Sequence, residues 1–125
     1  MRARNILALG WIVTVWAASA GAEPGFKTVD FPTSDGIEAR ADLYGDAESS
    51  ATLILLFHQA GWSRGEYREI APKLAAEGYR VLAVDQRAGR GVNGVANETH
   101  RRAAKKRLPT GYLNAYADLV AAMTY

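Results

Sequence analysis

The chain has 125 residues, of which 49% are hydrophobic and 22% are charged, and it contains no cysteine. A chain of this length forms one domain at most, and its composition is typical of a globular protein. The absence of cysteine excludes a disulfide scaffold, a thiolate metal site, a cysteine nucleophile and an acylated lipoprotein anchor. With only two histidines, His58 and His100, we expect no metal site and no cofactor.

The N-terminus has the pattern of a secretory signal peptide. Arg2 and Arg4 precede an apolar run over residues 6–17, and small residues follow over 18–22. The small residues fit cleavage before Glu23 or two residues earlier. An uncleaved membrane anchor is the alternative, but the run is shorter than the ~20 residues that span a bilayer. We therefore expect residues 1–22 to be a signal peptide and the protein to be exported, periplasmic or secreted, without a stable membrane anchor.

Removal of this segment changes the charge balance. It takes away two arginines and no acid, which leaves 13 basic and 13 acidic side chains. A nucleic-acid-binding surface needs a net positive field, so we expect no nucleic-acid partner.

The mature chain opens with a predicted antiparallel β-hairpin. Apolar and polar residues alternate over residues 26–31 and 37–44, and Ser34-Asp35-Gly36 lies between them. Asp-Gly favours a tight turn because glycine accepts positive φ. We expect one face of this hairpin to be in solvent.

A β-α-β unit is predicted next. Thr52–Phe57 is continuously apolar, as in a strand buried on both faces. The spacing predicts a helix over residues 66–77, kinked at Pro72, and residues 80–85 form a second buried strand. Within about 30 residues this is a right-handed crossover.

The remaining chain is predicted to be a glycine-rich loop over residues 86–94, a polar and weakly helical stretch over 96–107, and an amphipathic helix from Leu113 to the end. The fold class is therefore α/β. A hairpin, a β-α-β unit and a further helix form an incomplete doubly wound sheet, because a helix that follows a buried parallel strand should lead to another strand.

Gly61-Trp62-Ser63-Arg64-Gly65 matches the G-x-S-x-G nucleophile motif, and Asp85 and His100 follow in the order of a Ser-Asp-His triad. In that motif the serine lies on a turn directly after its strand, whereas here three residues intervene. His100 also lies in a charged stretch. We therefore interpret Ser63 as a loop serine or helix cap, and keep the triad as the alternative.

Two other motifs have simpler explanations. Residues 89–94 match the dinucleotide pattern G-x-G-x-x-G, but three residues separate them from their strand, and the acid at the right distance, Asp118, lies on a helix. We interpret these residues as a flexible loop. The basic residues between His100 and Arg107 have the pattern of a solvated helix face, and an anion-binding surface is the alternative.

The segments Leu55–Gly61 and Gly78–Gly91 resemble the α/β-hydrolase superfamily, most closely its dienelactone-hydrolase-like branch. The family pattern is an apolar third strand that ends in His and a glycine-containing turn, then a helix, then G-Y-x-V-x-x-x-D-x-R with glycines after it. Residues 118–125 are similar to the helix that precedes the nucleophile strand. The resemblance covers about residues 26–125.

The resemblance implies that His58–Gly61 is the oxyanion-side loop, which contributes one backbone N–H to the oxyanion hole. By position Ala60 is the favoured donor and Gln59 the second choice. His58 is expected to shape the loop rather than to act as a base. Gln59 departs from the common His-Gly turn of the family.

The resemblance also implies that the nucleophile and the rest of the triad come after Tyr125. Residues 23–125 would then be the N-terminal part of an exported serine-type hydrolase of ester or acyl bonds, with no catalytic triad of their own. In the family's sheet order Thr52–Phe57 would become an exposed apolar edge. We therefore expect this chain alone to fold poorly, to be inactive and to self-associate through that strand. The alternatives are a non-catalytic exported domain that binds a partner through the open edge and, less favoured, a nucleotide-binding fold.

Overall fold

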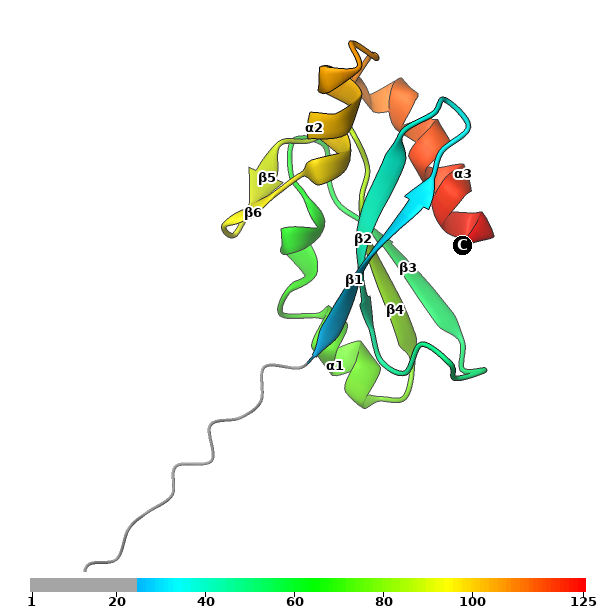
Figure 1. Cartoon of the computed structure of the whole chain (residues 1–125). Coiled ribbons are helices and arrows are strands. Elements are labelled where there is room, and N and C mark those ends of the chain that lie inside the picture. The colour runs from blue at the N-terminus through cyan, green and yellow to red at the C-terminus, as the bar shows by residue number, and fades with distance from the viewer. Residues whose placement is uncertain (1–24) are drawn as a thin grey trace, which may run out of the picture.

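The computed structural model describes residues 25–125, and the predicted signal peptide, residues 1–22, lies outside them. Four strands form one mixed sheet: β1 (Phe26–Pro32), β2 (Glu38–Tyr44), β3 (Leu53–Phe57) and β4 (Arg80–Asp85). Their order is β1-β2-β4-β3, with β3 parallel to β4 and the other neighbours antiparallel (Figure 1). The α/β class is confirmed.

The hairpin is confirmed, but its exposure differs from the prediction. Gly36 has φ +85° in the turn, where the Thr33 N–H donates to Ile37 O at 2.8 Å. β2 is buried on both faces over most of its length because it lies between β1 and β4. The alternation of Ala39 and Ala41 predicted one apolar face, and gave no signal that Asp42 on the other face is fully buried.

The segment between β3 and β4 is not one kinked helix. It forms a 3₁₀ turn, η1 (Arg64–Tyr67), and a separate helix, α1 (Ala71–Ala76). Pro72 lies in the first turn of α1. The missing N–H of proline costs nothing there, so Pro72 begins a helix rather than kinking one.

After β4 the chain forms a small hairpin of β5 (Gly91–Val92) and β6 (Val95–Ala96), then α2 (Glu98–Lys105), the 3₁₀ turn η2 (Tyr112–Ala115) and α3 (Tyr116–Thr124). No helix of residues 25–125 is long and apolar enough to span a membrane.

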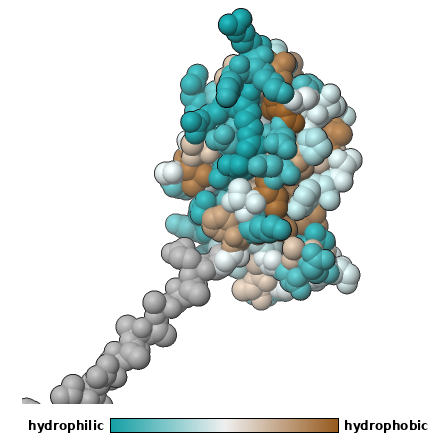
Figure 2. Space-filling model, viewed as in Figure 1, coloured by the Kyte–Doolittle hydropathy of each residue, from teal (hydrophilic) through white to brown (hydrophobic). Residues whose placement is uncertain are grey.

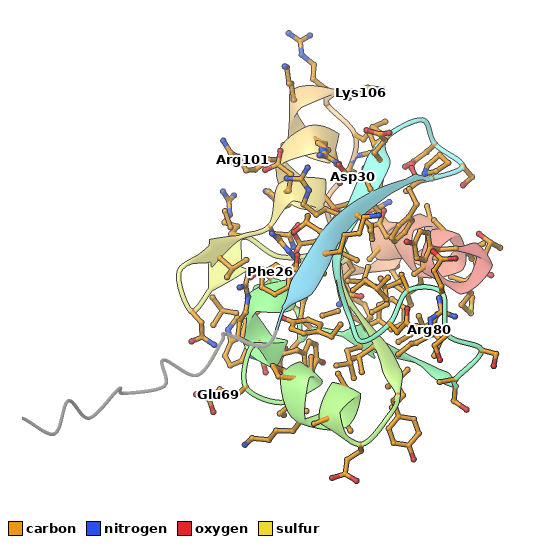
Figure 3. All side chains as sticks on the ribbon, turned by 60° about the horizontal axis from the view of Figure 1, so that its bottom comes forward. Phe26, Asp30, Glu69, Arg80, Arg101 and Lys106 are labelled. Carbon is orange, nitrogen blue, oxygen red and sulfur yellow. The ribbon has the colours of Figure 1, made fainter. Side chains whose placement is uncertain are left out.

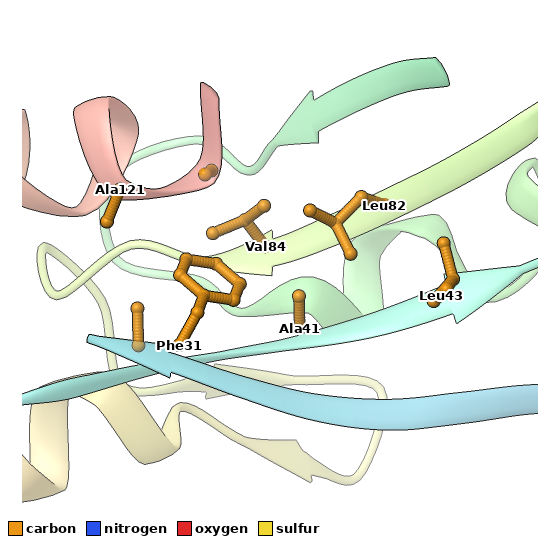
Figure 4. Packing of buried hydrophobic residues seen from close by; sticks show 8 residues of the cluster. Phe31, Ala41, Leu43, Leu82, Val84 and Ala121 are labelled. Carbon is orange, nitrogen blue, oxygen red and sulfur yellow. The ribbon is translucent and has the colours of Figure 1, made fainter. Parts of the chain in front are cut away.

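Two apolar layers lie on the two faces of the sheet. On one face α3 packs through Ala121 and Ala122 on side chains of β1, β2 and β4, among them Phe31 and Leu82 (Figure 4). On the other face α1 packs on Val81 and Ala83. β4 is fully buried from Val81 onward, whereas all five residues of β3 are only half-buried. The prediction of burial on both faces was therefore wrong for β3, which is an edge strand of this sheet.

Candidate functional site

The loops that follow β3 and β4 meet at the carboxyl ends of these strands. The chain goes from β3 to α1 on one face of the sheet and from β4 onward to α3 on the other face. The loops therefore diverge at a topological switch point, which is where open α/β sheets bind ligands. All four residues predicted for the oxyanion loop, His58 to Gly61, lie here.

His58 is buried and joins the two loops. Its Nδ1 lies 2.8 Å from Gln59 O, and its Nε2 lies 3.0 Å from Gln86 O and 3.2 Å from Asn97 Nδ2. Each ring nitrogen thus faces a backbone carbonyl oxygen, and the nitrogen that carries the proton donates to its carbonyl. Gln86 Nε2 in turn donates to His58 O. With both ring nitrogens engaged inside the protein, His58 shapes the loop.

The peptide between Gln59 and Ala60 is held through its carbonyl side. Gln59 O accepts from Trp62 N at 3.2 Å and contacts the His58 ring. The bond is trans, so its N–H points away from its C=O. Ala60 is exposed, and no acceptor among residues 25–125 takes its N–H. The Gln59 N–H differs, because it donates to Glu66 Oε2 at 2.9 Å.

Pairing between the two chain segments resumes just past this loop. The Gly61 N–H donates to Ala88 O at 2.7 Å, and the Arg90 N–H donates to Gly61 O at 3.0 Å. Gly61 has φ +96°, and a Cβ on Gly89 would overlap the Trp62 backbone. Both positions therefore require glycine.

Asp85 lies at the end of β4 and organises the chain around it. Its carboxylate accepts from Arg64 N at 2.8 Å, from Arg64 Nη1 at 2.6 Å and from Glu98 N at 2.8 Å. Burial raises the pKa of Asp85, and Arg64 opposes that effect. With all these donors inside the protein, Asp85 connects η1 and α2 to the sheet.

Ser63 is a buried structural serine. Its Oγ donates to Val95 O at 2.7 Å and accepts from Gly65 N, as the cap of η1, and from Val92 N. No hydrogen bond joins Ser63, Asp85 and His100, and His100 Nδ1 contacts Arg87 O instead. The geometry agrees with the interpretation of a helix cap. Gly65 is needed because a Cβ there would collide with Val95.

The glycine-rich run is a folded hairpin, not a flexible loop. Asn93 and Gly94 have φ +51° and +72° between β5 and β6, which is the turn that Asn-Gly favours. The prediction failed because each strand has only two residues. The run forms the first strand and the turn of this hairpin and does not open a helix, so the dinucleotide pattern lacks the context it needs.

The basic run belongs to α2 and the turn after it. Arg102 and Arg40 both pair with Asp30 of β1, and Arg101 pairs with Glu98. Figure 3 labels Arg101 on α2, Lys106 just after it and Asp30 on β1. These contacts lower the pKa of Asp30, chiefly through its hydrogen bond to Arg40. The surface over α2 is hydrophilic (Figure 2), as expected for a solvated helix face.

Sequence reasoning missed a buried ion network centred on Arg87. The guanidinium donates to Asp118 of α3, with Nη2 at 2.7 Å from Oδ1, and to Asp35 in the β1–β2 turn, with Nη1 at 2.5 Å from Oδ2. Arg87 and Asp118 are almost fully buried. The only signals were the D-x-R element after β4 and the acid on an apolar helix, and neither identifies its partner.

An apolar hollow of about 180 Å³ adjoins the loop region. Gln86, which is bonded to His58, lines it together with residues of η2 and α3: Tyr112, Leu113, Ala115, Tyr116 and Leu119. Within residues 25–125 no three acidic or histidine side chains gather as metal ligands would.

Comparisons with known proteins assign no family. No protein-family model matches the chain, and no curated protein matches it.

Proposed function

We propose that this chain is the N-terminal part of an exported serine-type α/β-hydrolase domain acting on ester or similar acyl bonds, and that the loop after β3 supplies one donor of its oxyanion hole. The sheet order β1-β2-β4-β3 and the loop at the switch point support this proposal. The observation that carries it is the Ala60 N–H, exposed and turned away from the Gln59 carbonyl that His58 and Trp62 hold.

The chemistry follows from this orientation. Acyl transfer builds negative charge on a carbonyl oxygen, and a fixed N–H dipole stabilises that charge by about 3 kcal/mol. A donor held on a rigid peptide needs no reorientation during the reaction. The apolar hollow beside Gln86 offers room for the acyl or alcohol group of a small ester. The attacking group would come from the residues that follow Tyr125.

Two measurements test this proposal. The DNA downstream of Tyr125 should encode a β-strand followed by G-x-S-x-G or G-x-C-x-G. In the protein that includes this segment, Ala60→Pro removes the N–H and should lower kcat for p-nitrophenyl acetate about 100-fold, whereas Ala60→Gly keeps it. Absence of the motif, or equal activity of the two variants, would contradict the proposal. So would hydrolysis by the 125-residue chain that Ser63→Ala abolishes.

A second candidate function is a non-catalytic module that associates with a second copy through β3. β3 has no charged residue and a free edge among the described strands, and charges are what normally protect such edges. α3 contacts β3 as well as β1 and β2, and Tyr116 and Met123 on this helix and Leu113 just before it are exposed apolar side chains. We infer that this apolar surface extends the β3 edge in the proposed dimer.

The oligomeric state tests this candidate. Sedimentation over a concentration series should show a dimer, and the double variant Leu113→Glu with Tyr116→Glu should shift it to monomer. Both side chains are exposed, at 88% and 71%, so the fold should tolerate the change. Ile70→Glu, at an exposed apolar residue just before α1, is the control. A monomeric wild type would exclude this candidate.

A further inference from the structure

The oxyanion loop has two neighbouring backbone amides, those of Gln59 and Ala60, that differ in what they bind. The four backbone N–H groups from Gln59 to Trp62 differ in their hydrogen-bond acceptors. Those of Gly61 and Trp62 donate to backbone carbonyls, that of Gln59 donates to the Glu66 carboxylate, and that of Ala60 has no acceptor among residues 25–125. The Glu66 side chain therefore determines whether the loop has one or two backbone N–H groups free to bind a ligand.

The residues on either side of Glu66 are anchored to the rest of the fold, which places Glu66 within reach of the loop. It lies in η1, which Ser63 caps and whose Arg64 is bound to Asp85 of β4. The next residue, Tyr67, donates its hydroxyl to Phe57 O at 2.6 Å, at the end of β3. Side chains of two successive η1 residues thus contact the backbone at the start of the loop, one through an N–H and the other through a C=O.

We infer that Glu66 is a positioning residue of this loop: its carboxylate occupies the Gln59 amide, so that Ala60 presents the single free donor. This inference rests on the proposed function of the loop. It also settles the choice between the two donors that position alone had left open, since an amide already bound to a carboxylate is not free for an oxyanion. A carboxylate acceptor suits the task because charge-assisted hydrogen bonds are the stronger ones.

Amide hydrogen exchange of the ¹⁵N-labelled chain, followed by NMR, tests the contact directly. In the wild type the Gln59 amide should be protected, and the Ala60 amide should exchange as an unprotected one does. Glu66→Ala should speed exchange at Gln59 about tenfold or more and leave Ala60 unchanged. Glu66→Gln keeps an acceptor and should retain most of the protection. Glu69→Ala removes an exposed carboxylate nearby and is the matched control.

A titration with acetate tests the consequence for anion binding. Acetate should shift the Ala60 amide resonance in the wild type, and both the Ala60 and Gln59 resonances in Glu66→Ala. The inference is overturned if Gln59 is unprotected in the wild type, if Glu66→Ala leaves its exchange unchanged, or if acetate shifts both amides equally in the wild type. These readouts need no turnover, so they fail independently of the hydrolysis test with Ala60→Pro.

Discussion

At the scale of single residues, several side chains of a catalytic type are committed to holding the chain in place. Ser63, Asp85 and His58 each direct their polar atoms at partners inside the protein. Reactive groups need a free approach for substrate, and these have none. The donor proposed to act at this site is instead a backbone group, the Ala60 N–H.

Ser63→Ala should lower the free energy of unfolding by about 1–3 kcal/mol, because it removes the cap of η1 and the buried partner of Val95 O. Urea denaturation measures the change. Ser50→Ala, at an exposed loop position, should be neutral. A Ser63 variant as stable as the wild type would contradict the structural role described for this hydroxyl.

At the scale of elements, α3 is attached to the sheet by an ion pair as well as by apolar packing. Asp118 is fully buried, and its carboxylate accepts from the Arg87 backbone N–H as well as from the guanidinium. The same guanidinium reaches Asp35 in the β1–β2 turn. One arginine thus connects a helix, a strand end and a hairpin that are far apart in the sequence.

Asp118→Asn should destabilise the protein by about 3–5 kcal/mol, because it leaves the buried Arg87 charge without its main partner. The free energy of unfolding from urea denaturation reports this loss, and Glu69→Gln, an exposed substitution, is the control. A change below about 1 kcal/mol would mean that Asp35 alone compensates Arg87.

Local patterns predicted the elements better than they predicted contacts between them. The four strands were found because each has a strong apolar or alternating pattern. The β5–β6 hairpin was missed although Asn93-Gly94 marks its turn, since two-residue strands have no periodicity to read. The partners of Arg87 lie in distant segments of the chain. Glu66 contacts Gln59, only seven residues before it, because of the path of the intervening loop. No periodicity in the sequence encodes either contact.

At the scale of the whole molecule, carboxylates bound to arginines make the free energy of unfolding depend on pH. The hydrogen bond from Arg87 lowers the pKa of Asp35 to about 2, whereas an unfolded aspartate titrates near ~3.9. A carboxylate whose pKa is lowered by folding stabilises the folded state at pH values above its pKa in the unfolded chain. That stabilisation is lost as the pH falls through its pKa in the folded state.

The free energy of unfolding should therefore drop between about pH 4 and pH 2. Asp35→Asn should be less stable than the wild type at pH 7 and should lose less stability over this range. Urea denaturation at a series of pH values measures both curves. Parallel curves for the two proteins would show that Asp35 keeps an ordinary pKa in the fold.

The bridge between Gly61 and Gly89 has a consequence for engineering. Residues 58–60 form a short loop whose two ends are fixed. The pairing of β3 with β4 fixes the first end, and the bridge between Gly61 and Gly89 fixes the second. The side chains of Gln59 and Ala60 are exposed, so these two positions should tolerate substitution, whereas the buried His58 contacts the Gln59 carbonyl. The length of the loop is fixed, because one inserted residue would move Gly61 out of register with Gly89.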